Sequence, residues 1–369
     1  MEMKKFPLIK PYIDQRMKDR VCKVLDSGFL SEGAVTKEFE ERLRQYLSCN
    51  YALAVTSCTT GLELALRALK IGPGDEVIVP DYTYPATADV VAIVGATIVL
   101  VDISRETMLI DYEAIEKVIT PRTRAMIPVS LFGNPLDYDR LREITKKTGI
   151  YLIEDAACSL GAEFKGEKVG SQADITIFSF HPRKFITTGE GGLITTNNRI
   201  WAEWMNSYKH FGAGISETRL TTSFERIGTN YKLSNLLAAV GLGQMEKIDE
   251  LLARRIELSE NYLTLLKDCD GVSLPQITHQ GKHSRQSFCI YINNRNKVMQ
   301  DLREIGIEVQ IGSYALHNYS PFSPGASCWL SGEMVNSQYA FDHCLALPLY
   351  HELTFADQQC IVQELLMRL

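Results

Sequence analysis

The chain has 369 residues, of which 45% are hydrophobic and 23% are charged. This composition is typical of a folded soluble protein and excludes a disordered or fibrous chain. The 39 basic and 45 acidic residues give a formal net charge of −6, with no basic stripe that could neutralise a nucleic-acid backbone. We therefore expect a large domain with a smaller one, and no nucleic-acid partner.

The nine cysteines are scattered along the chain and include no CxxC pair. This arrangement predicts neither a disulfide framework nor a zinc site, and we expect no bound metal. The first residues contain a basic cluster without an apolar run behind it, which does not fit a signal peptide. The longest apolar stretch, Val90 to Ile103, is too short to cross a bilayer. These features favour a cytoplasmic protein that does not enter a membrane.

Short apolar runs alternate with helical patterns between about residues 50 and 200. The runs are YALAVT, DEVIVP, TIVLVD, RAMIPVS, IYLIED, DITIFSF and GLITT, and the helical patterns include TTGLELALRAL and YEAIEKVI. Such runs, rich in Val and Ile, are typical of strands buried between two layers of helices. The alternation predicts an α/β fold with a mostly parallel, seven-stranded sheet that binds ligands at the carboxyl ends of its strands.

The pattern changes at about residue 232, where a long helical segment begins. Its sequence, LSNLLAAVGLGQMEKIDELLARRIELSENYLTLLKD, is followed by shorter mixed pieces and a final helix, FADQQCIVQELLMRL. We expect the second domain to begin within the long segment. The predicted division is a large α/β domain of residues 1–245, which includes the N-terminal segment, and a small α+β domain of residues 246–369.

Lys184 is the first candidate for chemistry. It lies in SFHPRKFITTGEGG, residues 179–192, between two predicted strands. A lysine in a loop is usually a solvated surface charge. Here a glycine-rich turn follows the lysine and an aspartate ends an earlier strand, so the segment favours a site at which lysine forms a Schiff base with a cofactor.

That aspartate is Asp155, at the end of the predicted strand IYLIED. An acidic residue in this position can simply cap the following helix. With pyridoxal phosphate (PLP) it has another role, because an ionised carboxylate keeps the ring nitrogen of PLP protonated through a charge-assisted hydrogen bond. Glu154, one residue earlier on the same strand, is expected to point the opposite way.

A phosphate site is predicted in TSCTTGLELALRAL, residues 56–69, where a strand runs into a hydroxyl-rich helix start. Free amides and hydroxyls at a helix N-terminus bind anions. An ordinary Ser/Thr N-cap without a ligand explains the pattern equally well. The chain contains neither GxGxxG nor GxxxxGK[ST], which disfavours a nicotinamide oxidoreductase and a P-loop nucleotide site.

Along nearly its whole length, the chain resembles the DegT/DnrJ/EryC1/StrS family of PLP-dependent nucleotide-sugar aminotransferases, which have the fold-type I architecture. The resemblance is carried by SGFLSEGAVTKEFE, TSCTTGLELAL, GPGDEVIVPDYTYPAT, IEDAA, SFHPRK with TTGEGG, GTNYKLSNLLAA and ALPLY. It implies that Lys184 carries PLP as a Schiff base, that Asp155 pairs with the pyridine nitrogen and that Tyr84 stacks on the ring. Cys158 departs from the family pattern, because many relatives have His or Gln there, and we expect it to be buried and inert.

The resemblance also assigns the cofactor phosphate. Ser179, Thr59, Thr60 and neighbouring amides would bind it within one subunit. Asn230 and Lys232 would reach the phosphate of a partner subunit, so the resemblance implies a homodimer with two shared active sites. Lys232 stands where Arg is common, and it supplies a point charge in place of a bidentate fork.

Four residues are expected near the substrate, with packing or loop anchoring as the alternative role for each. They are His181 beside the lysine, His210 in YKHFG, and Tyr314 and His317 in GSYALHNYSPF. Arg183, which also flanks the lysine, has the same two alternatives.

The predicted reaction moves an amino group from glutamate to a nucleotide-linked keto-sugar, in two stages with ping-pong kinetics and with Lys184 as the base. The TTGEGG form favours amination at C4 of a 4-keto-6-deoxyhexose, for surface polysaccharide or glycan synthesis. A 3-keto-sugar or cyclitol substrate remains an alternative, as does a PLP-binding regulator without catalysis. Dehydratases of this family carry His in place of the cofactor lysine, so Lys184 argues against that activity.

Overall fold

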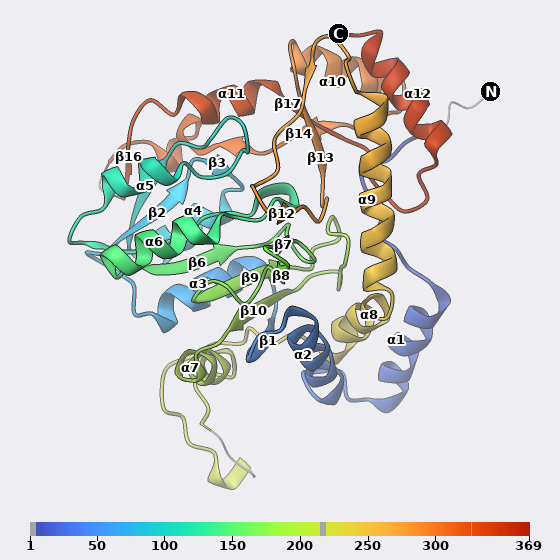
Figure 1. The fold of residues 1–369 in the computed structure, drawn as a ribbon. Helices are drawn as coiled ribbons and strands as arrows, with labels where there is room; N and C mark the ends of the chain where they lie inside the picture. The colour runs from blue at the N-terminus through green and yellow to red at the C-terminus, as the bar shows by residue number, and fades with distance from the viewer. Residues whose placement is uncertain (1–4, 215–218, 326) are drawn as a thin grey trace.

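The computed structural model describes residues 5–214, 219–325 and 327–369. Its centre is an eight-stranded sheet in the order β1-β10-β9-β6-β5-β2-β4-β16 (Figure 1). The strands are β1 (Tyr51–Val55), β2 (Glu76–Pro80), β4 (Thr97–Val101), β5 (Thr123–Met126), β6 (Tyr151–Asp155), β9 (Ile175–Ser179), β10 (Gly192–Thr196) and β16 (Cys328–Leu330). The first seven of these in chain order confirm the predicted strands. The eighth, β16, comes from the C-terminal part of the chain and was not predicted.

The sheet is mostly parallel, as predicted. Strands β9, β6, β5, β2, β4 and β16 each run parallel to the next. Strand β10 is antiparallel to both of its neighbours, β1 and β9. The parallel strands therefore bring their carboxyl ends to one edge of the sheet, which is where such folds bind ligands.

Helices cover both faces of the sheet. Side chains of α3 (Cys58–Ala68), α4 (Ala86–Ile93) and α7 (Arg199–Lys209) share a core with Ile177 of β9. The next residue of β9, Phe178, points to the other face and joins a core with α2 (Ala34–Leu47), α5 (Tyr112–Val118) and α6 (Tyr138–Thr148). Because neighbouring residues of one strand are both buried, the strand is apolar on both faces, which explains its continuous hydrophobic sequence.

The C-terminal residues form a second, smaller sheet in the order β11-β13-β17-β14. Its strands are β11 (Val272–Ser273), β13 (Phe288–Ile292), β14 (Gln310–Ile311) and β17 (Cys344–Leu347), and its helices are α10 (Arg295–Glu304), α11 (Val335–His343) and α12 (Phe355–Leu366). Three short pieces, β7 (Glu163–Phe164), β8 (Glu167–Lys168) and β12 (Gly281–Lys282), form a further sheet, and β3 (Tyr82–Thr83) pairs with β15 (Tyr314–Ala315).

The long helical segment predicted after residue 232 is interrupted. Helix α8 (Asn235–Met245) ends two residues before α9 (Ile248–Leu265) begins, and Lys247 has a non-helical φ of −120° and ψ of 14°. Helix α9 then extends along one side of the molecule toward α12 (Figure 1). The division of the chain at residue 245 stays a prediction. Strand β16 of the C-terminal part crosses this division, because it pairs with β4 in the large sheet.

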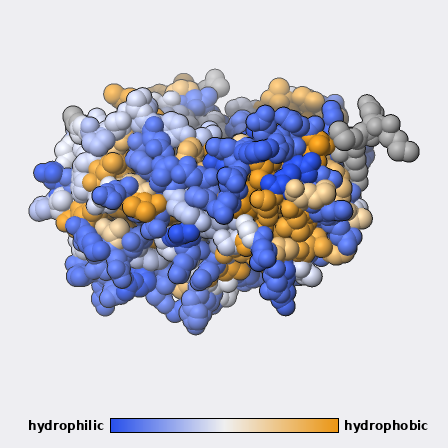
Figure 2. Space-filling view, turned by 90° about the horizontal axis from the view of Figure 1, so that it is seen from above, coloured by the Kyte–Doolittle hydropathy of each residue, from blue (hydrophilic) through white to orange (hydrophobic). Residues whose placement is uncertain are grey.

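Hydrophilic residues cover much of the face shown in Figure 2, and hydrophobic residues appear there as separate patches. Within the described ranges, no helix combines the length and the apolar character needed to cross a membrane.

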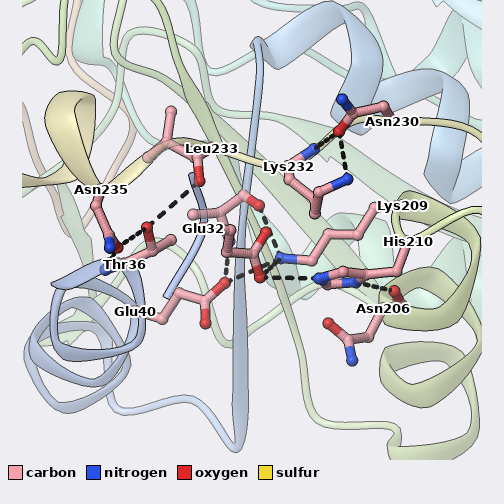
Figure 3. Close-up of polar contacts among 11 residues, drawn as sticks. Glu32, Thr36, Glu40, Asn206, Lys209, His210, Asn230, Lys232, Leu233 and Asn235 are labelled. Carbon is pink, nitrogen blue, oxygen red and sulfur yellow. Dashed lines mark hydrogen bonds and ion pairs between the residues drawn. The ribbon is translucent and has the colours of Figure 1, made fainter. Parts of the chain in front are cut away.

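A buried ion cluster joins the N-terminal segment to helix α7 (Figure 3). The Lys209 Nζ atom is fully buried and lies 3.2 Å from both Glu32 Oε1 and Glu40 Oε1, and it donates to the Ala54 carbonyl at 3.0 Å. His210 Nε2 contacts the same Glu32 oxygen at 3.2 Å. One lysine thus connects segments that are more than a hundred residues apart in the sequence.

The two carboxyl groups of this cluster respond differently to burial. The pKa of Glu32 is lowered, because burial, which would raise it, is outweighed by the hydrogen bond from His210 and the charge of Lys209. The pKa of Glu40 is raised, because burial outweighs its attraction to Lys209. Both carboxyl groups depend on the lysine, since a buried carboxylate without a cation is strongly destabilising.

Replacing Lys209 with Met should therefore destabilise the fold. At about pH 7 we expect the free energy of unfolding to fall by about 3–5 kcal/mol, seen as a melting temperature lower by roughly 5 °C. Without the cation, the folded-state pKa of Glu40 rises further above its unfolded value, because burial is no longer opposed by Lys209. Stability then decreases as pH rises, so the loss should be smaller at about pH 5.

Lys147→Met is the matched control. This lysine also pairs with a glutamate, Glu116 at 3.2 Å, but its side chain is 70% exposed, so its loss should hardly change the melting temperature. Equal melting temperatures for the two variants at neutral pH, or a loss in Lys209→Met that does not depend on pH, would contradict the role assigned to the cluster.

Candidate active site

A cavity of about 640 Å³ opens at the carboxyl edge of the large sheet. It lies where β6 and β9 end side by side, with Asp155 of β6 in register with Ile177 of β9. Residues from the N-terminal segment, the large sheet and the C-terminal part all line it. Among them are Ser57, Cys58, Thr59, Tyr84, Asp155, Cys158, Ser179, His181, Arg183, Lys184, Glu190, Gln286 and Tyr314.

Asp155 is the buried carboxylate of this cavity, with 5% of its surface exposed. Its Oδ2 atom accepts a hydrogen bond from Thr87 Oγ1 at 2.8 Å, and its Oδ1 atom accepts one from the Ala157 amide at 3.1 Å. Burial raises the pKa of Asp155, although these hydrogen bonds and the charge of Lys184 lower it. No cation contacts the carboxylate directly among the described residues, so a cationic ligand placed there would be stabilised.

Glu154 points away from the cavity, as strand alternation predicts. Its carboxyl group accepts hydrogen bonds from Tyr138 at 2.7 Å, from Thr176 at 3.3 Å and from Ser130. Burial raises the pKa of Glu154 to about 7, although the three hydrogen bonds lower it. The residue belongs to the core beneath α6, which confirms that the two neighbouring acids serve different surroundings.

Lys184 lies in the loop after β9, and its amine points into the cavity. Its Nζ atom donates a hydrogen bond to Cys158 Sγ at 3.1 Å. Burial lowers the pKa of Lys184, but Cys158, Cys58 and Asp155 together raise it by more, so the pKa lies above its ordinary value. In this arrangement the amine is a cation; only after losing its proton can it act as a nucleophile or a base.

Gln286 holds the lysine loop from the other side of the cavity, and the sequence did not point to it. Its side chain accepts from the Phe185 amide at 3.0 Å and donates to the Arg183 carbonyl at 2.8 Å, so it bonds the residues on both sides of Lys184. The fully buried Arg255 of α9 donates in turn to the Gln286 carbonyl at 2.5 Å. A lone glutamine in the C-terminal part of the chain carries no sequence pattern that could have revealed this contact.

The predicted phosphate segment forms the N-terminus of α3. Ser57 is the N-cap, and its side chain accepts from the Thr60 amide at 3.1 Å while Thr60 Oγ1 accepts from the Ser57 amide at 3.1 Å. The structure thus places the hydroxyl of Thr60 in a capping box, whereas Thr59 lines the cavity. Ser179, the last residue of β9, faces the same space, so hydroxyls and helix amides converge on it.

Aromatic residues form the mouth of the cavity. Tyr84 is 65% exposed, and its ring lies 6.2 Å from that of Tyr314, which in turn lies 5.8 Å from that of Tyr319. His181 also lines the cavity, and burial lowers its pKa although Glu190 raises it. Arg183 contacts Gln310 Oε1 at 3.3 Å, which connects the lysine loop to β14.

Five predicted site residues lie outside the lining of this cavity, and Thr60 is one of them, because its hydroxyl belongs to the capping box of α3. His317 Nδ1 is 2.7 Å from Asp81 Oδ2, and this pair anchors the segment after β15 to the start of β3. His210 belongs to the Glu32 cluster. Asn230 and Lys232 lie in a segment that runs antiparallel to the end of β1, with Lys232 bridged to Val55. The Lys232 Nζ atom donates a hydrogen bond to Asn230 Oδ1 at 2.6 Å (Figure 3).

Two residues that contact Asp155, Thr87 and Cys58, were also absent from the predicted site. Thr87, in the first turn of α4, orients Asp155, and its only sequence signal is its place in GPGDEVIVPDYTYPAT, one of the segments that carry the family resemblance. Cys58, the first residue of α3, has its sulfur 3.8 Å from Asp155 Oδ1. Both are short polar side chains whose role depends on a partner distant in sequence.

Within the described ranges, no group of three or more His, Cys, Asp or Glu side chains could hold a metal ion.

Comparison with known proteins gives one consistent result. Residues 11–366 match the DegT/DnrJ/EryC1/StrS aminotransferase family. GDP-perosamine synthase of Caulobacter vibrioides is 37% identical over 329 residues, which cover 87% of this chain and 88% of the relative. 

Solved structures agree with this match. Helicobacter pylori PseC, an aminotransferase of pseudoaminic acid biosynthesis, superimposes with a TM-score of 0.92 at 26% identity, covering 99% of each chain. A Streptococcus pneumoniae protein in its PLP form gives a TM-score of 0.92 at 29% identity, covering 99% of this chain and 98% of that one. These structures confirm the predicted fold class. The chain therefore belongs to the DegT/DnrJ/EryC1/StrS aminotransferase family and is a PLP-dependent sugar aminotransferase.

Proposed function

We propose that this enzyme transfers an amino group from glutamate to a nucleotide-linked 4-keto-6-deoxyhexose, with Lys184 as the residue that binds PLP. The observation that carries the proposal is the presence of the Lys184 amine and the buried Asp155 carboxylate in one cavity at the carboxyl edge of the sheet. We expect the reaction to take place in the cytoplasm, where the product enters surface polysaccharide or glycan synthesis.

The residues of the cavity fit the cofactor. Asp155 is a buried carboxylate whose pKa is raised by burial, and a protonated pyridine nitrogen would supply the cation that it lacks. The N-terminus of α3, with Thr59 and Ser179 beside it, suits a phosphate. Tyr84 offers a ring at the mouth for stacking. When bound, PLP supplies the electron sink on which amino transfer depends.

The residues of this chain would then act in sequence. Lys184 holds the cofactor and, when released, takes the proton from the donor Cα atom as a base. Asp155 keeps the ring nitrogen protonated, and Thr87 keeps Asp155 oriented. His181 and Tyr314, which line the outer part of the cavity, are placed to contact the sugar nucleotide. His317 and His210 have the contacts of positioning residues, through Asp81 and Glu32.

We also propose a homodimer with shared active sites. Asn230 is exposed, and Lys232 lies beside it in the segment that is bridged to the end of β1. Several large apolar side chains near this segment are exposed, which is typical of a surface that another subunit covers. They are Phe29 at 78%, Phe211 at 54%, Phe224 at 69% and Ile227 at 94%.

The assignment of Lys184 can be tested by absorbance. Wild-type protein should show the visible absorbance of PLP bound covalently to a lysine, and borohydride should fix the cofactor on the peptide that contains Lys184. Lys184→Ala should be colourless and should lose at least about a thousandfold in activity. A wild type that takes up no PLP, or a borohydride adduct in Lys184→Ala, would refute the assignment.

The substrate can be tested with a panel of sugars. Glutamate-dependent mass changes should be followed for dTDP-, UDP- and GDP-linked 3-keto and 4-keto sugars. The GDP-linked members have added support, because a relative 37% identical to this chain is named GDP-perosamine synthase. We expect amination of at least one 4-keto sugar. Amination of 3-keto sugars or cyclitols alone would move the substrate to the alternative class, and PLP binding without any turnover would favour a regulator.

Sharing of the active site can be tested with mixed dimers. Lys184→Ala and the double variant Asn230→Ala/Lys232→Ala should each be nearly inactive. In a hybrid of the two, one site combines an intact Lys184 with an intact partner segment, so unfolding and refolding the mixture should restore activity in about one quarter of the sites. Absence of any recovery, in a mixture that forms dimers, would show that each subunit completes its own site.

A further inference from the structure

Cys158, which we expected to be buried and inert, is only partly buried and lies directly beside Lys184, and the proposed reaction gives it no role. Its Sγ atom accepts a hydrogen bond from Lys184 Nζ at 3.1 Å, and both side chains line the cavity. Each is held by separate contacts. The Cys158 carbonyl accepts from Ser284 Oγ at 3.3 Å, and Gln286 bonds the backbone on both sides of Lys184. The thiol and the amine therefore stay together without the help of a ligand.

The amine that contacts this sulfur is a cation. The pKa of Lys184 is raised, because the effects of Cys158, Cys58 and Asp155 outweigh its burial. Oxidation of a cysteine by a peroxide proceeds through the thiolate, which is the nucleophilic form of the side chain. The cavity connects this sulfur to solvent, so a small oxidant can reach it.

The second thiol of the cavity is in a different environment. Cys58 Sγ lies 3.8 Å from Asp155 Oδ1. Burial raises the pKa of Cys58 well above its ordinary value, and donation of its hydrogen to the Asp155 carboxylate raises it further. Cys58 is therefore held as a protonated thiol, which is a poor nucleophile. The two cysteines serve as a matched pair, one beside a cation and one beside an anion.

We propose that Cys158 and Lys184 form a sulfur–nitrogen cross-link when the cofactor-free enzyme meets a peroxide, and that this bond blocks cofactor loading. The second half of the proposal rests on the proposed role of Lys184 in binding PLP. The cross-link itself depends only on the contact between the two side chains.

The chemistry balances with hydrogen peroxide as the oxidant. The Cys158 thiolate attacks one peroxide oxygen, the O–O bond breaks, and a sulfur–oxygen bond forms while hydroxide leaves and takes a proton to become water. The deprotonated Lys184 amine then attacks the sulfur, which breaks the S–O bond and releases a second water. In total, one thiol, one amine and one peroxide give an S–N bond and two waters. Two equivalents of an added thiol reverse the bond and form a disulfide.

Mass spectrometry of the full chain tests the cross-link. After removal of the cofactor, peroxide should lower the intact mass by about 2 Da, which corresponds to the two hydrogens lost, and should join the peptides that contain Cys158 and Lys184. Treated protein should take up less than about a tenth as much PLP as untreated protein, and dithiothreitol should restore both the mass and the uptake.

Two serine variants decide which thiol reacts. Cys58→Ser should still form the cross-link, whereas Cys158→Ser should keep its mass under the same treatment. Loss of the mass change in Cys58→Ser would identify a disulfide between the two cysteines and overturn the proposal. Addition of oxygen to Cys158 without a cross-link to Lys184 would overturn it as well.

A protection experiment separates this proposal from the function proposed above. Protein loaded with PLP should resist cross-linking, because the Lys184 nitrogen is engaged. If the cross-link forms equally with and without PLP, the role of Lys184 in cofactor binding fails while the redox chemistry stands. If no cross-link forms but borohydride still fixes PLP on Lys184, the redox proposal fails and the aminotransferase assignment stands.

Discussion

The parallel pairing of β6 with β9 is the constraint on which the active site depends. Because the two strands run in the same direction, Asp155 at the end of one and the loop after Ser179 at the end of the other open at one edge of the sheet. The register places Asp155 beside Ile177, two residues before β9 ends, so the chain has room to turn and bring Lys184 back over the carboxylate. A shift by one residue would reverse the faces of the strand and bury Glu154 in the cavity in place of Asp155.

Charge is distributed around this edge so that each buried group needs a specific partner. Asp155 is oriented by Thr87 and an amide, yet burial still raises its pKa because no cation contacts it among the described residues. The Lys184 amine donates a hydrogen bond to the Cys158 sulfur. The cavity thus places a carboxylate where a cationic ring can bind and an amine where a carbonyl can bind. Contacts within the protein hold both groups in position. The same preorganisation brings a thiol into contact with the amine, and this contact gives the enzyme a sensitivity to oxidation that amino transfer does not require.

Much of the fold could be predicted because its information is local. The predicted strands follow from apolar runs that are buried on both faces. The choice of Asp155 follows from its position at a strand end, and that of Lys184 from the glycine-rich loop between two strands. The rest depends on contacts between distant residues. Nothing in CWL predicts that β16 joins the large sheet, since its pairing with β4 spans more than two hundred residues. Lys209 looks like an exposed residue at the end of a helix and is buried only because Glu32 and Glu40 meet it there.

The contacts around Lys209 also give rigid support to the segment that is proposed to contact a second subunit. The segment that contains Asn230 and Lys232 pairs with the end of β1, and the Tyr231 amide donates to the Lys209 carbonyl at 3.3 Å. Beneath it, Glu32 and Glu40 hold the Lys209 side chain, and the Asn235 side chain donates to the Phe29 carbonyl at 2.9 Å. The N-terminal segment, α7 and the Asn230 segment are therefore fastened to one another inside a single chain. A lysine presented from such a support would lose little conformational freedom on binding a phosphate, which supports the proposed contact of Lys232 with the partner's cofactor even though its ammonium is a point charge.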